Sequence, residues 1–174
     1  ETDAGIYSAE VIENEIRLEM VPPKNNFEKT VKLNSAEIKG YFINTGVPHF
    51  VIFDSPSQSI VEQASKIRYH ELFAPDGTNI DYVRVENRNE ISIRTYERGV
   101  EDETLACGTG SVAAVLLTNA LKRTEGIVSV KTKSGVILKV GGRFTRGDFK
   151  GVFLQGEARE IYTAKTGRDI KLID

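Results

Sequence analysis

Short runs of alternating apolar and polar residues make up most of this chain and predict a fold rich in strands. Residues 15–20 alternate in this way and stop before Pro22. Residues 50–53 are almost entirely apolar, which predicts a strand that is covered on both faces. Turn-rich tripeptides separate two further pairs of runs, and each pair predicts a hairpin. These pairs are 80–85 with 90–96 and 128–132 with 136–140, and a last strand is predicted at 152–154 after the turn-rich residues 141–151.

Two segments change to helical spacing. The first begins at a start signal in which Ser55 caps, Pro56 takes the first helical position and Gln58 follows three residues after the cap. The second, residues 111–123, contains no Gly or Pro and ends in two basic residues shortly before Gly126, which is a stop signal. Apolar residues surround most of the second helix, so it is predicted to be buried on nearly all sides. The pattern therefore favours antiparallel strands wrapped around this helix.

The only cysteine, Cys107, stands just ahead of this second helix in the sequence CGTG. Free backbone N–H groups at a helix N-terminus favour an anion, and they favour a thiolate over a thiol. The sequence therefore predicts an ionisable cysteine beside a small anion-binding loop. A buried structural cysteine, with glycines that only relieve a tight bend, is the simpler alternative.

Length and composition bound the function. The 174 residues, 40% of them hydrophobic, suffice for one large domain or two small ones with a real core. The net charge of -2 gives no reason to expect nucleic acid or an anionic membrane as a partner, and neither a membrane-spanning run nor a signal peptide is visible. A single cysteine fits the cytoplasm and excludes an internal disulfide framework. With only His49 and His70 beside it, no metal centre is expected.

Polar residues gather in four segments where a strand-rich core needs none. His49 taken alone fits a loop, and Asn79 taken alone fits a turn. Together the four segments resemble the C-terminal part of diaminopimelate epimerase, in that family's order and spacing over nearly all of residues 40–160. The resembling motifs are NTGVPHFVIF, APDGTNIDYV, TYERGVEDETLACGTGSVAA and VFLQGEA.

The resemblance implies an α+β fold in which antiparallel strands form a barrel-like sheet around a buried central helix. It also divides the chain into three parts. Residues 1–41 correspond to the trailing strands of a truncated N-terminal domain and a linker, and residues 42–160 to the C-terminal epimerase domain. Residues 161–174 correspond to a segment that returns to the N-terminal domain.

The activity that the resemblance implies is an isomerase that interconverts LL- and meso-diaminopimelate, in the synthesis of lysine and peptidoglycan precursors. Two cysteines exchange the Cα proton without pyridoxal phosphate, metal or another cofactor, and Cys107 matches one of them. His49 matches a histidine near the reacting carbon, and Glu97 matches a polar residue at the charged ends of the substrate.

The substrate-binding residues that the resemblance implies are Asn79, Arg98, Gly108 and Thr109. The last two match the loop whose backbone N–H groups hold the α-carboxylate, and the first matches an asparagine at the distal end of the substrate. Val47 departs from the family, which commonly has an asparagine there that binds the distal amino-acid group. Asn44, three residues earlier, is the candidate that replaces it.

The family's second cysteine lies in a CGNG-type motif that these residues lack. Because the chain also begins with Glu1, we expect a C-terminal fragment or one of two chains of a split enzyme. The expected partners are a small amino-acid substrate, a missing N-terminal half or separate chain that supplies the second cysteine, and, as a further arrangement, a second copy in a homodimer. The isolated chain is expected to be inactive.

Three alternatives stay open at this stage. A racemase of another amino acid in the same family, such as histidine, would carry much the same residues. A thiol pair of Cys107 and His49 for acyl transfer is the second alternative, but it leaves Glu97 without a role. A non-catalytic binding module that keeps the anion loop is the third, and it rests on the absence of a second cysteine.

Overall fold

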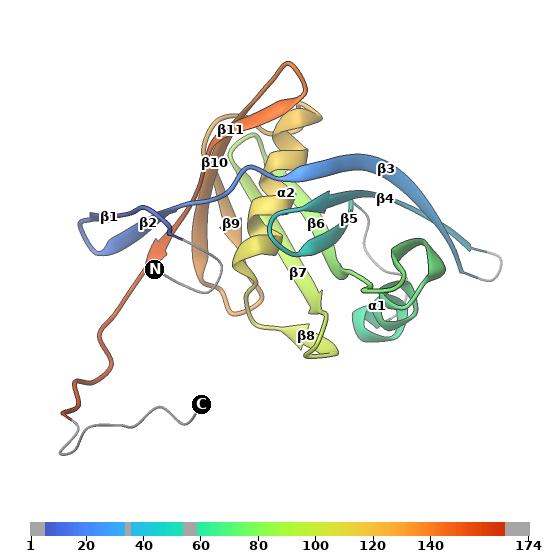
Figure 1. The fold of residues 1–174 in the computed structure, drawn as a ribbon, viewed down its shortest axis with the longest axis horizontal. Helices are drawn as coiled ribbons and strands as arrows, with labels where there is room; N and C mark the ends of the chain where they lie inside the picture. The colour runs from blue at the N-terminus through green and yellow to red at the C-terminus, as the bar shows by residue number, and fades with distance from the viewer. Residues whose placement is uncertain (1–5, 34–35, 54–58, 166–174) are drawn as a thin grey trace.

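A computed structural model describes residues 6–33, 36–53 and 59–165, and within these ranges the side chains of all residues except 24–27. The described chain forms a sheet of eleven strands in the order β1-β2-β11-β10-β9-β7-β6-β5-β4-β3, with β8 paired to β7 (Figure 1). Two α-helices and one short 3-10 helix accompany it. The elements are β1 (Ala9–Ile12), β2 (Glu15–Glu19), β3 (Lys24–Leu33), β4 (Ala36–Asn44), β5 (Pro48–Ile52), α1 (Ile60–Arg68), η1 (Glu71–Phe73), β6 (Asn79–Asn87), β7 (Glu90–Glu97), β8 (Asp102–Thr104), α2 (Gly108–Ala120), β9 (Val128–Lys131), β10 (Ile137–Thr145) and β11 (Asp148–Glu157).

The sheet is mixed, and its strand order runs as an open path from β1 to β3. The predicted barrel-like closure is therefore wrong. Two neighbouring pairs, β5 with β6 and β7 with β9, are parallel, whereas the others are antiparallel. Parallel neighbours need a crossover connection, and here α1 follows β5 while α2 lies between β7 and β9 in the chain. The wholly antiparallel pairing expected from the hairpin pattern is thus interrupted twice.

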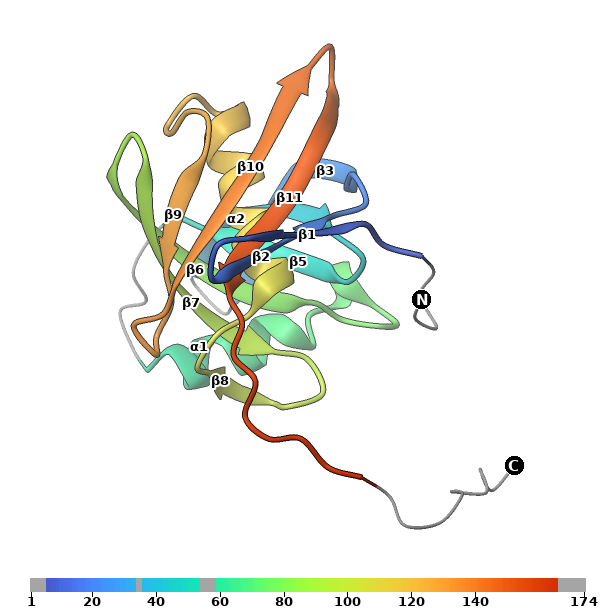
Figure 2. The same cartoon turned by 90° about the vertical axis from the view of Figure 1, so that its left-hand side faces the viewer.

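Helix α2 is buried because nearly every residue on it is small or apolar. Its residues 110–118 are all buried, and they pack against strands from both halves of the sheet, including β10, β11, β5 and β6. The sheet curves round this helix, as two perpendicular views show (Figures 1 and 2). The helix starts three residues earlier than the sequence pattern predicted and ends at Ala120, before the basic residues. A residue with left-handed backbone, Lys122, follows its end.

Strands β5 and β6 are covered on both faces, as predicted for residues 50–53. Phe50 and Ile80 pack in one apolar cluster with α1, whereas Val51 and Val83 pack in the other with α2. Successive side chains alternate between the two faces of a strand. His49 and Asp81, which stand two positions before Val51 and Val83, therefore lie on the face that meets α2.

Both predicted hairpins are present, since β6 pairs with β7 and β9 pairs with β10 in antiparallel register. The turn-rich reading of residues 141–151 is wrong, because β10 continues to Thr145 and β11 begins at Asp148. Glycines occur within β10 for a packing reason. A Cβ at Gly141 would lie 2.4 Å from the ring of Phe153 across the strand pair.

The predicted start signal of the first helix, Ser55 with Pro56 and Gln58, lies outside the described residues. The helix itself runs from Ile60 to Arg68. The alternation did not reveal β1, β3, β4 or β8.

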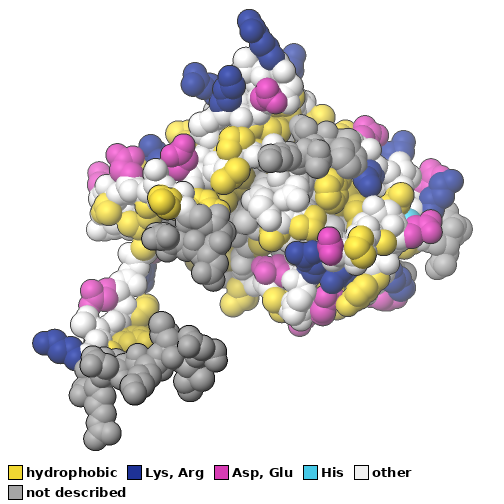
Figure 3. Space-filling view, in the orientation of Figure 1, with side chains coloured by type: hydrophobic (Ala, Val, Ile, Leu, Met, Phe, Trp, Pro, Cys, Tyr) yellow, Lys and Arg dark blue, Asp and Glu magenta, His cyan; other side chains and the backbone are white. Residues whose placement is uncertain are grey.

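Residues 158–165 leave the sheet as an extended segment in which Ile161 is 85% exposed (Figure 2). Over the face drawn in Figure 3, described side chains of both charge signs are interspersed. No helix in the described part of the chain is long and apolar enough to cross a membrane.

The burial of α2 makes a stability prediction. Leu116 is fully buried, and truncating it to alanine removes apolar contacts on several sides, so Leu116→Ala should lower the free energy of unfolding by about 2–5 kcal/mol. Leu121, just past the end of the helix, is 36% exposed, and Leu121→Ala should cost less than about 1 kcal/mol. Urea unfolding of both variants measures the difference. Equal losses would contradict the burial of α2.

Candidate functional site

Cys107 caps the N-terminus of α2. Its backbone is extended, and its sulfur accepts a hydrogen bond from the Gly110 N–H at 3.4 Å, in the position that a hydroxyl takes in an ordinary N-cap. Within the described part of the chain, the N–H groups of Gly108 and Thr109 have no hydrogen-bond partner. Two donors at the positive end of the helix are therefore available to an anion next to the thiol.

A hydrogen-bonded chain connects this cysteine to a buried histidine. Thr109 Oγ1 lies 3.5 Å from Cys107 Sγ and 3.0 Å from Nε2 of His49. The other ring nitrogen of His49, Nδ1, lies 2.7 Å from Oδ2 of Asp81. The side chains of His49 and Asp81 are both fully buried on the α2 face of β5 and β6. Cys107 and His49, both predicted as site residues, thus meet through Thr109 rather than directly.

Asp81 is a residue that the sequence did not single out. Its second oxygen, Oδ1, accepts a hydrogen bond from the Thr95 hydroxyl at 2.7 Å, so both carboxylate oxygens are satisfied. The carboxylate also needs the glycine at position 110, where a Cβ would lie 2.6 Å from Oδ1. In an alternating run an acidic residue is typical of a solvent-facing position. A strand that is covered on both faces has no solvent-facing position, so an acidic residue within it indicates a buried polar site.

Asn79 lies beside His49, because the parallel register of β5 and β6 pairs these two residues. Its Nδ2 is 3.5 Å from His49 Nε2, and its Oδ1 accepts the backbone N–H of Arg98 at 2.7 Å. Glu97 takes no part in the series of hydrogen bonds from Cys107 to Asp81. Its Oε1 accepts a hydrogen bond from the Thr104 hydroxyl at 2.6 Å.

A cavity of about 320 Å³ lies next to two of the residues predicted to bind substrate. It is lined by Asn44, Pro48 and Arg98, among others. The Asn44 side chain accepts the Gly46 N–H at 3.0 Å and so closes the turn before β5. The Arg98 guanidinium donates to the carbonyl of Asp76 at 3.3 Å. The structure therefore brings these two candidate binding residues to one hollow.

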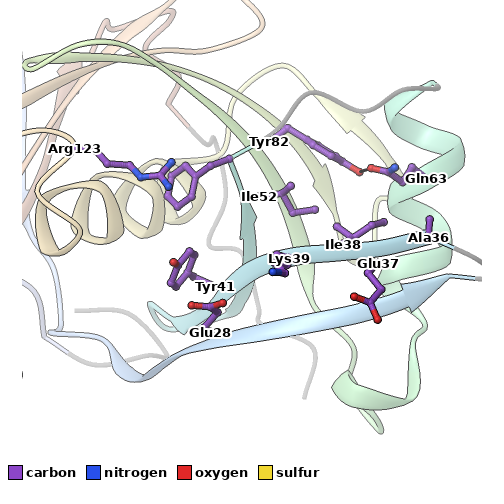
Figure 4. A pocket seen from close by; sticks show the side chains of 11 residues that line it. Glu28, Ala36, Glu37, Ile38, Lys39, Tyr41, Ile52, Gln63, Tyr82 and Arg123 are labelled. Atoms are coloured by element: carbon purple, nitrogen blue, oxygen red, sulfur yellow. Dashed lines mark hydrogen bonds between the residues drawn. The ribbon is translucent and has the colours of Figure 1, made fainter.

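A second cavity, of about 700 Å³, contains none of the predicted site residues (Figure 4). Tyr41, Tyr82 and Arg123 are among the residues that line it. Tyr82 donates a hydrogen bond to Gln63 at 2.6 Å, and burial raises the pKa of this tyrosine.

The prediction that the helix N-terminus favours the thiolate is wrong for this structure. Cys107 is only 9% exposed, and burial, followed by the negative charge of Asp81, raises the pKa of its thiol to about 12. The hydrogen bonds that Cys107 makes with Thr109 and Gly110 lower the thiol pKa but do not compensate. A helix terminus contributes about 0.3–2 kcal/mol, which burial beside a carboxylate outweighs. Cys107 is therefore a thiol near neutral pH and can donate a proton.

Among the described residues, no group of three or more histidine, cysteine, aspartate or glutamate side chains is placed to hold a metal ion. The polar groups of the site are a thiol, two amide N–H groups and the hydrogen-bonding side chains of His49, Thr109 and Asn79 around one buried carboxylate. Such a set can bind an anionic group and move a proton beside it.

Solved structures with a similar architecture include an epimerase and a phenazine biosynthesis protein. The hydroxyproline epimerase from Agrobacterium vitis is 17% identical, with a TM-score of 0.69 over 88% of this chain and 54% of that chain. The Bacillus anthracis phenazine biosynthesis protein of the PhzF family is 13% identical, with a TM-score of 0.58 over 90% of this chain and 64% of that chain. These likenesses define the fold.

Sequence comparison defines the family. The diaminopimelate epimerase family matches residues 41–149. The diaminopimelate epimerases of Aquifex aeolicus and of Hydrogenobaculum are each 40% identical over 177 residues, which is 98% of this chain and 62% of the relative. The chain therefore belongs to the diaminopimelate epimerase family, and it spans 62% of the length of these two relatives.

The raised thiol pKa predicts slow alkylation of the folded chain. Because iodoacetamide reacts with the thiolate, the rate at about pH 8 should be at least about tenfold lower for the folded chain than for the chain in guanidinium chloride. The rate for the unfolded chain should level off above the ordinary thiol pKa of 9.0, whereas the folded chain's rate should still be rising there. Mass spectrometry reports one site, since Cys107 is the only cysteine. Coincident profiles would rule out a protonated resting thiol.

Proposed function

We propose that this chain carries the proton-donating cysteine of an epimerase that interconverts LL- and meso-diaminopimelate. The supporting observation is the position of the Cys107 thiol beside the N–H groups of Gly108 and Thr109, which have no hydrogen-bond partner among the described residues. Membership of the diaminopimelate epimerase family supports the substrate. The corresponding role is in lysine and peptidoglycan precursor synthesis, a cytoplasmic process.

The two N–H groups answer the main difficulty of the reaction. Removing a proton from a carbon next to a carboxylate places further negative charge on a group that is already anionic. Without an electron-accepting cofactor, fixed dipoles aimed at the carboxylate have to stabilise that charge. Backbone donors at the start of a buried helix are already oriented, and their effect grows when water is excluded. We therefore assign the α-carboxylate to Gly108 and Thr109.

The reaction requires a second group that transfers a proton. A base on one face of Cα takes the proton, and an acid on the opposite face returns one, which inverts the configuration. Cys107, held as a thiol, fits the acid. In the proposed two-cysteine mechanism the base is a second cysteine as its thiolate, and in the reverse direction the two exchange roles. Since the 174 residues contain one cysteine, this second cysteine comes from a further segment or another chain.

His49 and Glu97 fit supporting roles around this exchange. The full burial of His49 behind Thr109 favours an effect on the thiol through the Thr109 hydroxyl. Glu97 is held by Thr104 and adds a smaller negative influence on the thiol. We propose that Glu97 faces the ammonium group of the substrate, as the family resemblance implies.

The distal end of the substrate is assigned to the hollow lined by Asn44 and Arg98, beside Asn79. A guanidinium suits a distal carboxylate, and an amide oxygen suits a distal ammonium. Val47 is half-buried and offers neither donor nor acceptor. Because Val47 stands where the family commonly has an asparagine, other amino acids, histidine first, should be tested as substrates in addition to diaminopimelate.

The chain-level organisation is also a proposal. We assign residues 42–160 to the domain that carries Cys107 and residues 1–41 to the trailing strands of a neighbouring domain. Strands β1 and β2 lie beside β11, and β3 and β4 lie beside β5 at the other end of the sheet order, so the boundary falls within β4. Residues 161–174 would return to the neighbouring domain, and of these only 161–165 are described.

Solvent exchange tests the reaction. The chain is joined to the part of the Aquifex aeolicus relative that it does not cover, and LL-diaminopimelate is incubated with the product in D2O. We expect deuterium at Cα together with the meso isomer, and we expect Cys107→Ala to lower the rate by at least about 10²-fold, because a positioned acid is worth about 10²–10⁴.

Three results would count against the proposal. They are epimerisation that survives Cys107→Ala, full-rate epimerisation by the unjoined chain, and exchange with histidine but not with diaminopimelate. The matched control is Arg88→Ala. Arg88 is an exposed arginine paired with Glu125 and lies outside the site, so this variant should retain the parent rate.

Binding can be tested on the chain alone. Diaminopimelate should protect Cys107 from alkylation, and lysine, which lacks one carboxylate, should protect less. Arg98→Ala should raise the half-protecting concentration about tenfold or more, since a charge-assisted hydrogen bond contributes about 1.5–3 kcal/mol. Arg88→Ala again serves as the arginine control. Equal protection of both variants would remove Arg98 from the distal site.

A further inference from the structure

The buried carboxylate of Asp81 has no task in the proposed proton exchange, yet the site is built around it. Both of its oxygens are occupied, Oδ2 by Nδ1 of His49 and Oδ1 by the Thr95 hydroxyl, each at 2.7 Å. An ionised carboxylate can only accept hydrogen bonds. Nδ1 of His49 must therefore carry a hydrogen.

Asn79 imposes the same orientation from the other side of the ring. Its Oδ1 accepts the Arg98 N–H at 2.7 Å, which turns the NH₂ group of the amide towards His49. That NH₂ lies 3.5 Å from Nε2 and can only donate. This arrangement assigns Nε2 as an acceptor and the imidazole as the Nδ1–H tautomer.

This tautomer decides the direction of the next two hydrogen bonds. The Thr109 hydroxyl has one hydrogen, and Nε2 of His49 receives it at 3.0 Å. The lone pairs of Oγ1 are then left for Cys107, 3.5 Å away, so the S–H group donates to Thr109. In all three hydrogen bonds of this series, the donated hydrogen therefore points away from the thiol and towards Asp81.

We propose that Asp81 is a positioning residue for Cys107: by fixing the tautomer of His49 it makes Thr109 an acceptor for the thiol hydrogen, and so keeps Cys107 as a proton donor. The importance of a protonated Cys107 for catalysis rests on the proposed function. The directions of the hydrogen bonds follow from the structure and do not depend on that function.

The charged and titratable groups near the thiol agree with this assignment. Asp81 from β6 and Glu97 from β7 present negative charge to it, and His49 from β5 presents its imidazole through Thr109. Asp81 is the larger of the two carboxylate influences on the thiol pKa. Removing its charge should therefore make Cys107 easier to ionise, both directly and through the relaxed hydrogen bonds of His49 and Thr109.

Nitrogen-15 NMR of the two imidazoles tests the tautomer in the parent chain. His70 is an internal control, because its Nδ1 accepts the Leu72 N–H at 3.2 Å and its hydrogen must therefore be on Nε2. The chain contains only these two histidines. We expect opposite tautomers, with His49 protonated on Nδ1 and His70 on Nε2. A hydrogen on Nε2 of His49 would overturn the proposal without any variant.

Variants then test the consequence for Cys107. Asp81→Asn should shift the pH profile of alkylation down by about one unit or more, which is a rate increase of about tenfold at a fixed pH below the profile midpoint. Glu86→Gln removes an exposed carboxylate from the same strand and should leave the profile unchanged. An unchanged profile in Asp81→Asn would contradict the proposal.

A double-mutant comparison separates positioning from simple charge. In a Thr109→Val background, which breaks the connection to His49 but keeps the shape, the effect of Asp81→Asn should shrink. An equal effect in both backgrounds would mean that Asp81 acts by charge alone, and the positioning role would fail. None of these measurements uses epimerase activity, so a negative exchange assay and a negative tautomer assay have separate meanings.

Discussion

The parallel pairing of β5 with β6 is the constraint on which the site depends. It sets His49 beside Asn79, and the two-residue period of a strand then brings Asp81 to the same face. Helix α2 lies against that face, and its first turn supplies Cys107 and Thr109. A slip of one residue in either strand would turn the imidazole or the carboxylate towards α1 instead, and the chain of hydrogen bonds would be lost.

The sequence was most informative where the local pattern and the tertiary environment agree. The apolar run after Cys107 predicted a buried helix, and the alternating runs around the Asn87 turn predicted a hairpin, because packing there only reinforces the local preference. The parallel pairs were not visible, since a parallel neighbour is set by a distant segment. Asp81 escaped for the same reason: its partners His49 and Thr95 are 32 and 14 residues away.

The state of Cys107 shows how competing local effects are resolved only by the fold. Position at a helix N-terminus is readable from sequence and favours ionisation, whereas depth and the proximity of a carboxylate from another strand are not readable. In the structure the second pair of effects prevails. The site residues inferred from the family resemblance lie close together, but their division into a network around Thr109, a separate Glu97 and a distal hollow is a property of the three-dimensional arrangement.

A sulfur that keeps its hydrogen is also protected from oxidation. Peroxides and disulfides react with the thiolate, so the Cys107 S–H group, in a residue that is only 9% exposed, reacts slowly with either. The same enclosure that prepares Cys107 to give up a proton therefore slows its conversion to sulfenic acid and its crosslinking to other chains.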